Sequence, residues 1–274
     1  MWKTLSSWKH TKSHFSAESI AVTNIFMTKQ LFLQILQYNI RKSLKIQKSF
    51  LINREICKFN IIIIQKQSCN INVLQTFNST HSFFYLVENS SSQTRTCIYV
   101  NKHLKLDQWT AKTIKSNICL IKLLTSSSDD ETLTLRVINV YNSCSLFIIF
   151  TKESFTISRL NELIKNDCKH LIVKDFNMHY SHWKDKRCFT HHIVIDALLD
   201  IITNVRLKLL LKSNTIIREF HNQLTIINLV FDSKKIQFMI YKCKMRTDLH
   251  QESDHLSIVM KLCLCTFFVQ LTTH

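Results

Sequence analysis

The sequence lacks glycine and proline entirely over its 274 residues. Average usage predicts on the order of 19 glycines and 14 prolines in a chain of this length. A folded domain needs glycine where turns and helix ends require a positive φ, so selection for folding does not explain the loss. Alanine is nearly absent too and remains only at Ala17, Ala21, Ala111 and Ala197. Because the codons of these amino acids (GGN, CCN and GCN) begin with two G or C bases, the cause lies in the gene.

Two explanations for this bias remain open. A directed mutational process that changes G to A and C to T would convert glycine into Ser, Asn, Lys, Arg, Asp or Glu, and proline into Ser, Leu or Phe. The same changes would convert Glu into Lys and Asp into Asn. An AT-rich genome is the alternative. The third codon positions of the gene and the dinucleotides that flank the changed bases would distinguish the two explanations.

Acidic residues are also few, with 19 Asp and Glu against 36 Lys and Arg, which gives a net charge of +17. Such a charge favours nucleic acid or an anionic membrane surface as a partner. Only part of it is evidence for binding, because the inferred mutations themselves create lysine and arginine. Hydrophobic residues make up 46% of the chain and charged residues 20%, which is typical of a globular protein and excludes disorder as the default state.

No apolar run approaches the roughly 18–20 residues that span a bilayer, so no membrane partner is expected. The ten cysteines include no CxxC pair, which disfavours a zinc site or a disulfide framework and favours an intracellular location, in the nucleus or cytoplasm. Residues 1–30 are basic and rich in Ser and Thr. We interpret them as an irregular N-terminal extension, with a transit peptide as the alternative.

Strand-like and helix-like hydrophobic patterns alternate along the rest of the chain. Helices are predicted at residues 44–58, 153–166 and 192–204. Strands are predicted at residues 33–39, 61–65, 83–87, 96–100, 118–124, 132–141, 171–175, 215–218, 225–231, 237–244 and 255–264. The sequence contains no Pro/Gly-rich linker that would mark a domain boundary. The pattern therefore indicates one α/β domain over residues 31–264, in which two sheets pack together and are covered by helices. A tail follows at residues 265–274.

Four polar clusters stand at predicted strand ends, where catalytic groups often collect. They are Gln37-Tyr38-Asn39, Gln65-Lys66-Gln67, Lys174-Asp175-Phe176-Asn177 and Ser253-Asp254-His255. Each cluster alone predicts no more than a turn or a cap. In chain order, together with Val140-Tyr141-Asn142-Ser143 and Thr225-Ile226-Ile227-Asn228-Leu229-Val230-Phe231, they resemble the endonuclease/exonuclease/phosphatase superfamily. Within it they are most similar to the endonucleases of non-LTR retrotransposons, whose motifs read QYN-RKS, IQEP, VYNPP, GDFN, TIDLVF and SDH.

The resemblance covers about residues 31–264 and implies the fold of that superfamily. This fold is a single-domain, four-layer α/β sandwich, in which two packed, mainly antiparallel sheets are flanked by helices. It also implies a magnesium-dependent phosphodiesterase that acts on DNA as a monomer, with no obligate protein partner. By the same resemblance Mg²⁺ would be held by Asn39 and the residue at position 66.

The resemblance also implies roles around the phosphate. His255 would contact the phosphate or activate water, with Asp254 or position 228 fixing its tautomer. Asp175 and Asn177 would handle the nucleophile and the leaving oxygen. Tyr141 would be a further phosphate donor, and Thr215 a weaker phosphate contact. The nearby pair His179 and His182 is expected to lie on a surface loop rather than to bind a metal.

This chain departs from the family motifs at the site itself. Lys66 stands where the motif has the metal-binding Glu, and Asn228 stands where it has Asp. Lys174 and Ser143 replace a Gly and a Pro, and each change fits the inferred mutations. Reversing a carboxylate beside a dication changes the interaction by on the order of 16 kcal/mol before screening, so metal binding and activity are expected to be impaired.

Alternatives to an enzyme also remain open. In the first alternative, the chain is a basic protein that binds nucleic acid without catalysis. In the second, it is a translated relic without function. The ammonium group of Lys66 could itself take the place of the cation and act as a point charge on phosphate. That alternative predicts weak phosphate binding that needs no metal.

Overall fold

The chain divides into two units, residues 1–31 and Phe32–His274. The computed structural model describes residues 32–70, 75–76, 81–88, 94–114, 117–124, 134–141, 152–164, 169–175, 193–211, 215, 218–220, 223–225, 228–249 and 253–264. All of them belong to the second unit. The predicted extension at 1–30 and the predicted tail at 265–274 lie outside the described residues.

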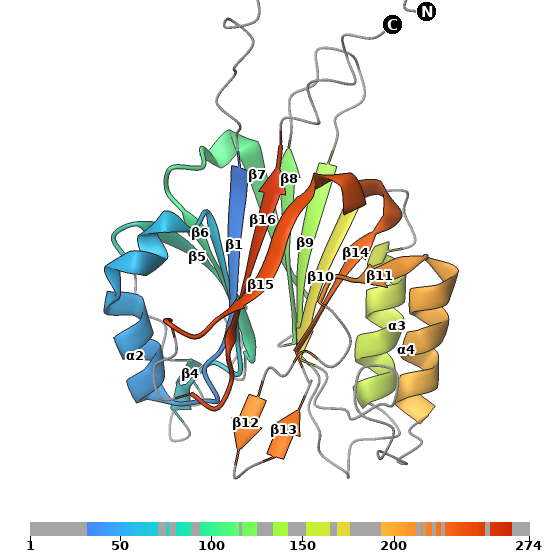
Figure 1. The fold of residues 1–274 in the computed structure, drawn as a ribbon, viewed down its shortest axis with the longest axis horizontal. Coiled ribbons are helices and arrows are strands. Elements are labelled where there is room, and N and C mark those ends of the chain that lie inside the picture. The colour runs from blue at the N-terminus through green and yellow to red at the C-terminus, as the bar shows by residue number, and fades with distance from the viewer. Residues whose placement is uncertain are drawn as a thin grey trace, which may run out of the picture. The chain divides into compact units, whose positions relative to one another are not determined.

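One six-stranded sheet has the order β15-β16-β1-β2-β6-β5 (Figure 1). Its strands are β1 (Phe32–Asn39), β2 (Ile61–Gln65), β5 (Phe84–Val87), β6 (Thr96–Asn101), β15 (Ile240–Arg246) and β16 (Ser257–Cys263). Only the β1–β2 pair is parallel, with Asn39 opposite Gln65, and every other pair in this sheet is antiparallel. The ends of β1 and β2 therefore lie together.

The second six-stranded sheet has the order β11-β14-β10-β9-β8-β7. Its strands are β7 (Trp109–Ile114), β8 (Ile118–Leu124), β9 (Thr134–Tyr141), β10 (Lys169–Asp175), β11 (Leu207–Leu209) and β14 (Asn228–Ser233). The β9–β10 pair is parallel, with Tyr141 opposite Asp175, and the other pairs are antiparallel. Two short hairpins, β3 (Cys69–Asn70) with β4 (Gln75–Thr76) and β12 (Arg218–Phe220) with β13 (Gln223–Thr225), stand outside these sheets.

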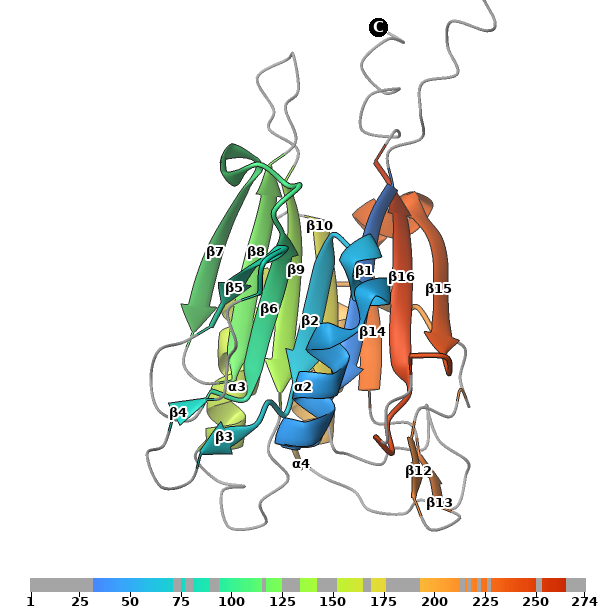
Figure 2. The ribbon, with the colours of Figure 1, turned by 90° about the vertical axis from the view of Figure 1, so that its left-hand side faces the viewer.

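The two sheets pack face to face over a shared apolar core (Figure 2). Strand β1 shows how its sequence serves two layers, because successive side chains point to opposite faces. Leu33 and Ile35 belong to the core between the sheets, whereas Leu36 and Tyr38 belong to a second core beneath α2. Burying both faces explains why β2 reads as an unbroken run of isoleucines.

Helices cover the outer faces of both sheets. Helix α2 (Leu44–Ile52) packs on the first sheet, and α3 (Lys152–Ile164) and α4 (Ile193–Asn204) lie side by side on the second (Figure 1). The result is the predicted four-layer α/β sandwich with mainly antiparallel sheets, and the fold class is confirmed. Among the described helices, none is both long enough and apolar enough to cross a membrane.

Several predicted boundaries were wrong. The predicted helix at 44–58 breaks at Asn53, because the Asn53 side chain accepts a hydrogen bond from Glu55 N (2.9 Å) and starts a separate 3₁₀ turn, η1 (Arg54–Lys58). Residues predicted as the start of a strand at 237 form the end of a 3₁₀ turn, η4 (Lys234–Met239), before β15. Strand β7, which a 3₁₀ turn η2 (Leu106–Gln108) precedes, was not predicted, because its largely exposed edge position leaves few apolar residues to mark it.

Without glycine, other residues must adopt the left-handed backbone conformation. Among the described residues, four have a positive φ: Arg41 (52°), Lys42 (62°), Lys66 (51°) and Arg206 (53°). All four are basic. The left-handed conformation costs a residue with a Cβ atom roughly 1–2 kcal/mol, so these positions store strain.

Candidate active site

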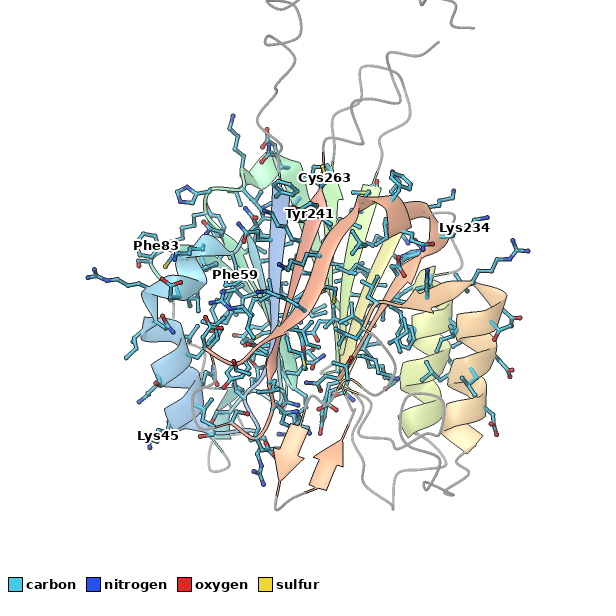
Figure 3. All side chains as sticks on the ribbon, viewed as in Figure 1. Lys45, Phe59, Phe83, Lys234, Tyr241 and Cys263 are labelled. Carbon is cyan, nitrogen blue, oxygen red and sulfur yellow. The ribbon has the colours of Figure 1, made fainter. Side chains whose placement is uncertain are left out.

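The predicted site residues come together at one end of the sandwich, here called the site end, where β1, β2, β9 and β10 finish. Asn39 and Asp175 end strands of different sheets, yet the Nδ2 atom of Asn39 donates to Oδ2 of Asp175 at 2.6 Å. Both side chains are fully buried. Cys263, at the end of β16, pairs with Phe32 at the start of β1 and marks the opposite end of this sheet (Figure 3). The hydrogen bond from Asn39 therefore joins the two sheets at the site end.

Lys66 also lies within this cluster. Its Nζ atom is 3.0 Å from Oδ2 of Asp175, and its side chain is 14% exposed. The same Nζ atom is 5.8 Å from the centre of the Tyr141 ring, which is buried at the end of β9. A lysine ammonium thus balances the charge of a carboxylate that is completely removed from solvent.

The turn after β1 holds both Asn39 and Lys66 in place. Ile40 N donates to Gln65 O at 3.1 Å, and Lys42 N donates to Lys66 O at 2.5 Å. Arg41 N donates to Oδ1 of Asn39 at 3.0 Å. The Asn39 amide is therefore engaged on both sides, with its oxygen on a backbone N–H and its nitrogen on Asp175.

The segment before β16 brings His255 to the same place. Ser253 Oγ donates to Asn39 O at 3.0 Å and accepts from His255 N at 3.1 Å, which anchors the segment to the end of β1. His255 is 1% exposed. Its Nδ1 atom is 3.5 Å from Nδ2 of Asn228, and its Nε2 atom is 3.7 Å from Oδ1 of Asp254. The imidazole therefore lies between an amide and a carboxylate.

Cations gather around this cluster. Arg41 Nη1 lies 3.3 Å from Oδ2 of Asp254. The pKa of Lys42 is lowered, first by burial and then by the positive charges of Arg95 and Lys66. Lys42 N also donates to Lys66 O, so these two lysines are neighbours at the site end.

A buried polar network lies between the sheets near the site end, and its central residue, Asn139, was not among the predicted site residues. Gln37 Nε2 donates to Gln65 Oε1 at 2.7 Å, and Gln65 Nε2 donates to Asn139 Oδ1 at 3.1 Å. Asn139 Nδ2 in turn donates to the carbonyls of Ile64 (2.9 Å) and Cys97 (3.1 Å). The signal in the sequence was the presence of single polar residues within otherwise apolar strands.

The other predicted residues are placed less completely. Asn177, His179 and His182 lie outside the described residues, so their predicted positions stay predictions. Thr215 is partly buried, and its neighbours in the sequence also lie outside the described part of the chain.

The described residues do not fit a bound Mg²⁺ ion. That ion needs oxygen ligands, but Lys66 brings an ammonium group to the position where the family motif has a carboxylate. The oxygen of Asn39 already accepts from Arg41 N. Within the described part of the chain, no group of three or more His, Cys, Asp or Glu residues is placed to hold a metal ion.

Comparisons with known proteins agree with the geometry. Residues 135–259 match the family described as endonuclease-reverse transcriptase. No curated protein matches the chain. The endonuclease domain of TRAS1, a telomere-specific non-LTR retrotransposon, is a similar solved structure, with a TM-score of 0.63, 16% identity, and coverage of 85% of this chain and 99% of that one.

Two further solved structures are similar. The AP endonuclease LMAP from Leishmania major has a TM-score of 0.64 and 11% identity, with coverage of 88% of this chain and 90% of that one. The catalytic domain of APE2 from Xenopus laevis has a TM-score of 0.57 and 12% identity, with coverage of 83% and 91%. The chain therefore has the fold of the endonuclease/exonuclease/phosphatase superfamily, and the match over residues 135–259 confirms the predicted resemblance to endonucleases associated with reverse transcriptases.

Proposed function

We propose that this chain descends from a magnesium-dependent DNA endonuclease of a non-LTR retrotransposon, and that Lys66 and Asn228 leave this copy without nuclease activity. The observation that carries the proposal is the ion pair between Lys66 Nζ and Asp175 Oδ2 at 3.0 Å. The pair occupies the position where the family motif has two carboxylates, at 66 and 175. The ammonium group repels a dication at this position instead of binding it.

Asn228 weakens the site in a second way. Its amide lies 3.5 Å from Nδ1 of His255, so it is placed to orient the imidazole. An amide carries no charge, however, and cannot stabilise a protonated imidazole as an aspartate would. The Oδ1 atom of Asn228 is buried and has no hydrogen-bond partner among the described residues. A carboxylate at position 228 would accept a hydrogen bond from the Nδ1–H group of His255.

The proposed roles of the remaining residues follow from their positions. His255 would hold or transfer a proton at the phosphate, and Asp254 beside its Nε2 atom would share that task. Asp175, buried between the sheets, would orient the reacting groups once Lys66 no longer neutralises it. DNA is the proposed ligand, because the fold is that of nucleases and the site end carries several cations.

The test is a supercoiled-plasmid nicking assay with Mg²⁺. It compares the chain as written with the double variant Lys66→Glu plus Asn228→Asp. The double variant should nick the plasmid and the unchanged chain should not. Lys242→Glu is the matched control, because it makes the same charge change on an exposed part of β15 and should not restore activity.

Two outcomes would contradict the proposal. Equal nicking by the unchanged chain and the double variant would show that Lys66 does not disable the site. A double variant that is folded, as judged by circular dichroism, but does not nick would show that the site was not inherited from a nuclease of this kind. The two single variants then show whether position 66 or position 228 limits activity.

A further inference from the structure

Lys66 is held at both ends. Its main chain is fixed by a backbone hydrogen bond, and its ammonium group is paired with Asp175. The residue has a positive φ of 51°, and its carbonyl accepts from Lys42 N. Its Nζ atom lies 3.0 Å from a fully buried carboxylate, and 14% of its side chain is exposed. A compact point charge that is held at a fixed place on a partly exposed side chain is a suitable partner for a phosphate oxygen.

The charges around Lys66 do not balance. Two of the cations at the site end have carboxylate partners, since Arg41 pairs with Asp254 and Lys66 pairs with Asp175. Lys42 N donates to Lys66 O, and the pKa of Lys42 is lowered by burial and then by the positive charges of Arg95 and Lys66. Among the described side chains, no carboxylate forms an ion pair with Lys42 or Arg95. Among the described side chains, the charges of Lys42 and Arg95 are therefore in excess, and an anion bound near them would reduce their mutual repulsion.

We propose that Lys66 acts as a built-in cation, and that the site end binds the oxyanion of a phosphodiester without any divalent metal. Lys42 and Arg95 would attract the same anion, while the backbone around Asn39 fixes where the ammonium lies. This inference rests on the proposed function, because it assigns a present-day activity to the same inherited site. Binding without hydrolysis is expected, because the proposed metal-dependent reaction needs the carboxylate that Lys66 replaces.

The probe is thymidylyl-thymidine, a dinucleotide with one phosphodiester and one negative charge. A single charge limits attraction to the rest of this basic chain. The dinucleotide is titrated with the full chain and followed by ³¹P NMR, once with EDTA and once with Mg²⁺. The expected result is the same binding curve in both. Binding that appears only with Mg²⁺, or no shift of the ³¹P signal at all, would overturn the inference.

Variants at position 66 test the role of the ammonium group. Lys66→Gln should weaken binding about tenfold, as expected for a lost hydrogen bond to a charged group, whereas Lys66→Arg should retain most of it. Lys242→Gln removes the same charge from exposed β15 and should change binding less than twofold. Equal weakening by Lys66→Gln and Lys242→Gln would show only general charge attraction. The EDTA comparison on the unchanged chain decides the matter if Lys66→Gln does not fold.

This outcome can be separated from that of the nicking assay. If the double variant nicks DNA but the unchanged chain does not bind thymidylyl-thymidine in EDTA, the descent stands and the built-in cation is wrong. If the unchanged chain binds in EDTA but the folded double variant never nicks, the binding site is real and its nuclease origin is wrong.

Discussion

Asn39 and Asp175 are separated by 136 positions in the chain, yet their side chains are joined by a hydrogen bond of 2.6 Å. Asn39 ends a strand of one sheet, and Asp175 ends a strand of the other. Lys66 contacts the same oxygen of Asp175. Asn39 and Lys66 together stabilise the buried carboxylate of Asp175. Because these contacts join the two sheets, residues of the candidate site also contribute to the stability of the sandwich.

Lys66→Met should lower the free energy of unfolding by about 3 kcal/mol, because it leaves a buried carboxylate without its cation. Adding Asp175→Asn to the same chain should recover much of that loss, since the unpaired charge is then removed as well. Urea unfolding at neutral pH measures both effects. An unchanged midpoint for Lys66→Met would show that the ion pair does not contribute to stability.

Asn139→Leu should lower the free energy of unfolding by about 2–4 kcal/mol. The change removes the buried hydrogen bonds that the Asn139 side chain makes with Gln65 Nε2 and with the carbonyls of Ile64 and Cys97. The double variant Asn139→Leu plus Gln65→Leu should lose less than the sum of the two single changes, because it removes both partners of one hydrogen bond. Strictly additive losses in urea unfolding would contradict a coupled network.

Asp232 makes stability depend on pH. Both of its carboxylate oxygens are buried without a hydrogen-bond partner among the described residues, and burial raises its pKa from 3.8 to about 6. The folded state therefore holds a proton more tightly than the unfolded state, so stability falls as pH rises from about 4 to about 6. The full loss is on the order of 2–3 kcal/mol.

The matching variant is Asp232→Asn, which cannot ionise. It should be more stable than the unchanged chain above pH 6, and the difference should vanish near pH 4. Urea unfolding at a series of pH values between 4 and 8 measures this difference. A difference that stays constant across the series would show that the ionisation of Asp232 is not its source.

Arg206→Gly should raise the free energy of unfolding by about 1 kcal/mol. Arg206 lies two residues after the end of α4 with φ at 53°, and its N–H bonds to Thr203 O at 3.1 Å, which is the usual setting for a C-terminal glycine cap. Lys208→Gly, in the extended strand β11, is the control and should be destabilising. If both variants lose stability equally, the backbone at Arg206 is not strained.

The fold class and most of the strands could be predicted from the residue pattern alone. Residues 61–65 and 171–175 were predictable as strands because both faces of these strands are buried, so their apolar runs are nearly continuous. The order of the polar clusters at strand ends was enough to predict the resemblance to a nuclease superfamily. The two departures at Lys66 and Asn228 were also visible without coordinates, because they depend only on residue identity.

The directions and contacts of those side chains, in contrast, depend on how the two sheets pack. Nothing local to Lys66 indicates that its ammonium group lies 3.0 Å from Asp175, because that distance depends on how two sheets pack. The hydrogen bond from Asn39 Nδ2 to Asp175 and the network around Asn139 arise in the same way. Local patterns carry information about backbone period and burial, whereas contacts between residues about 100 positions apart are set by the packing of the whole core.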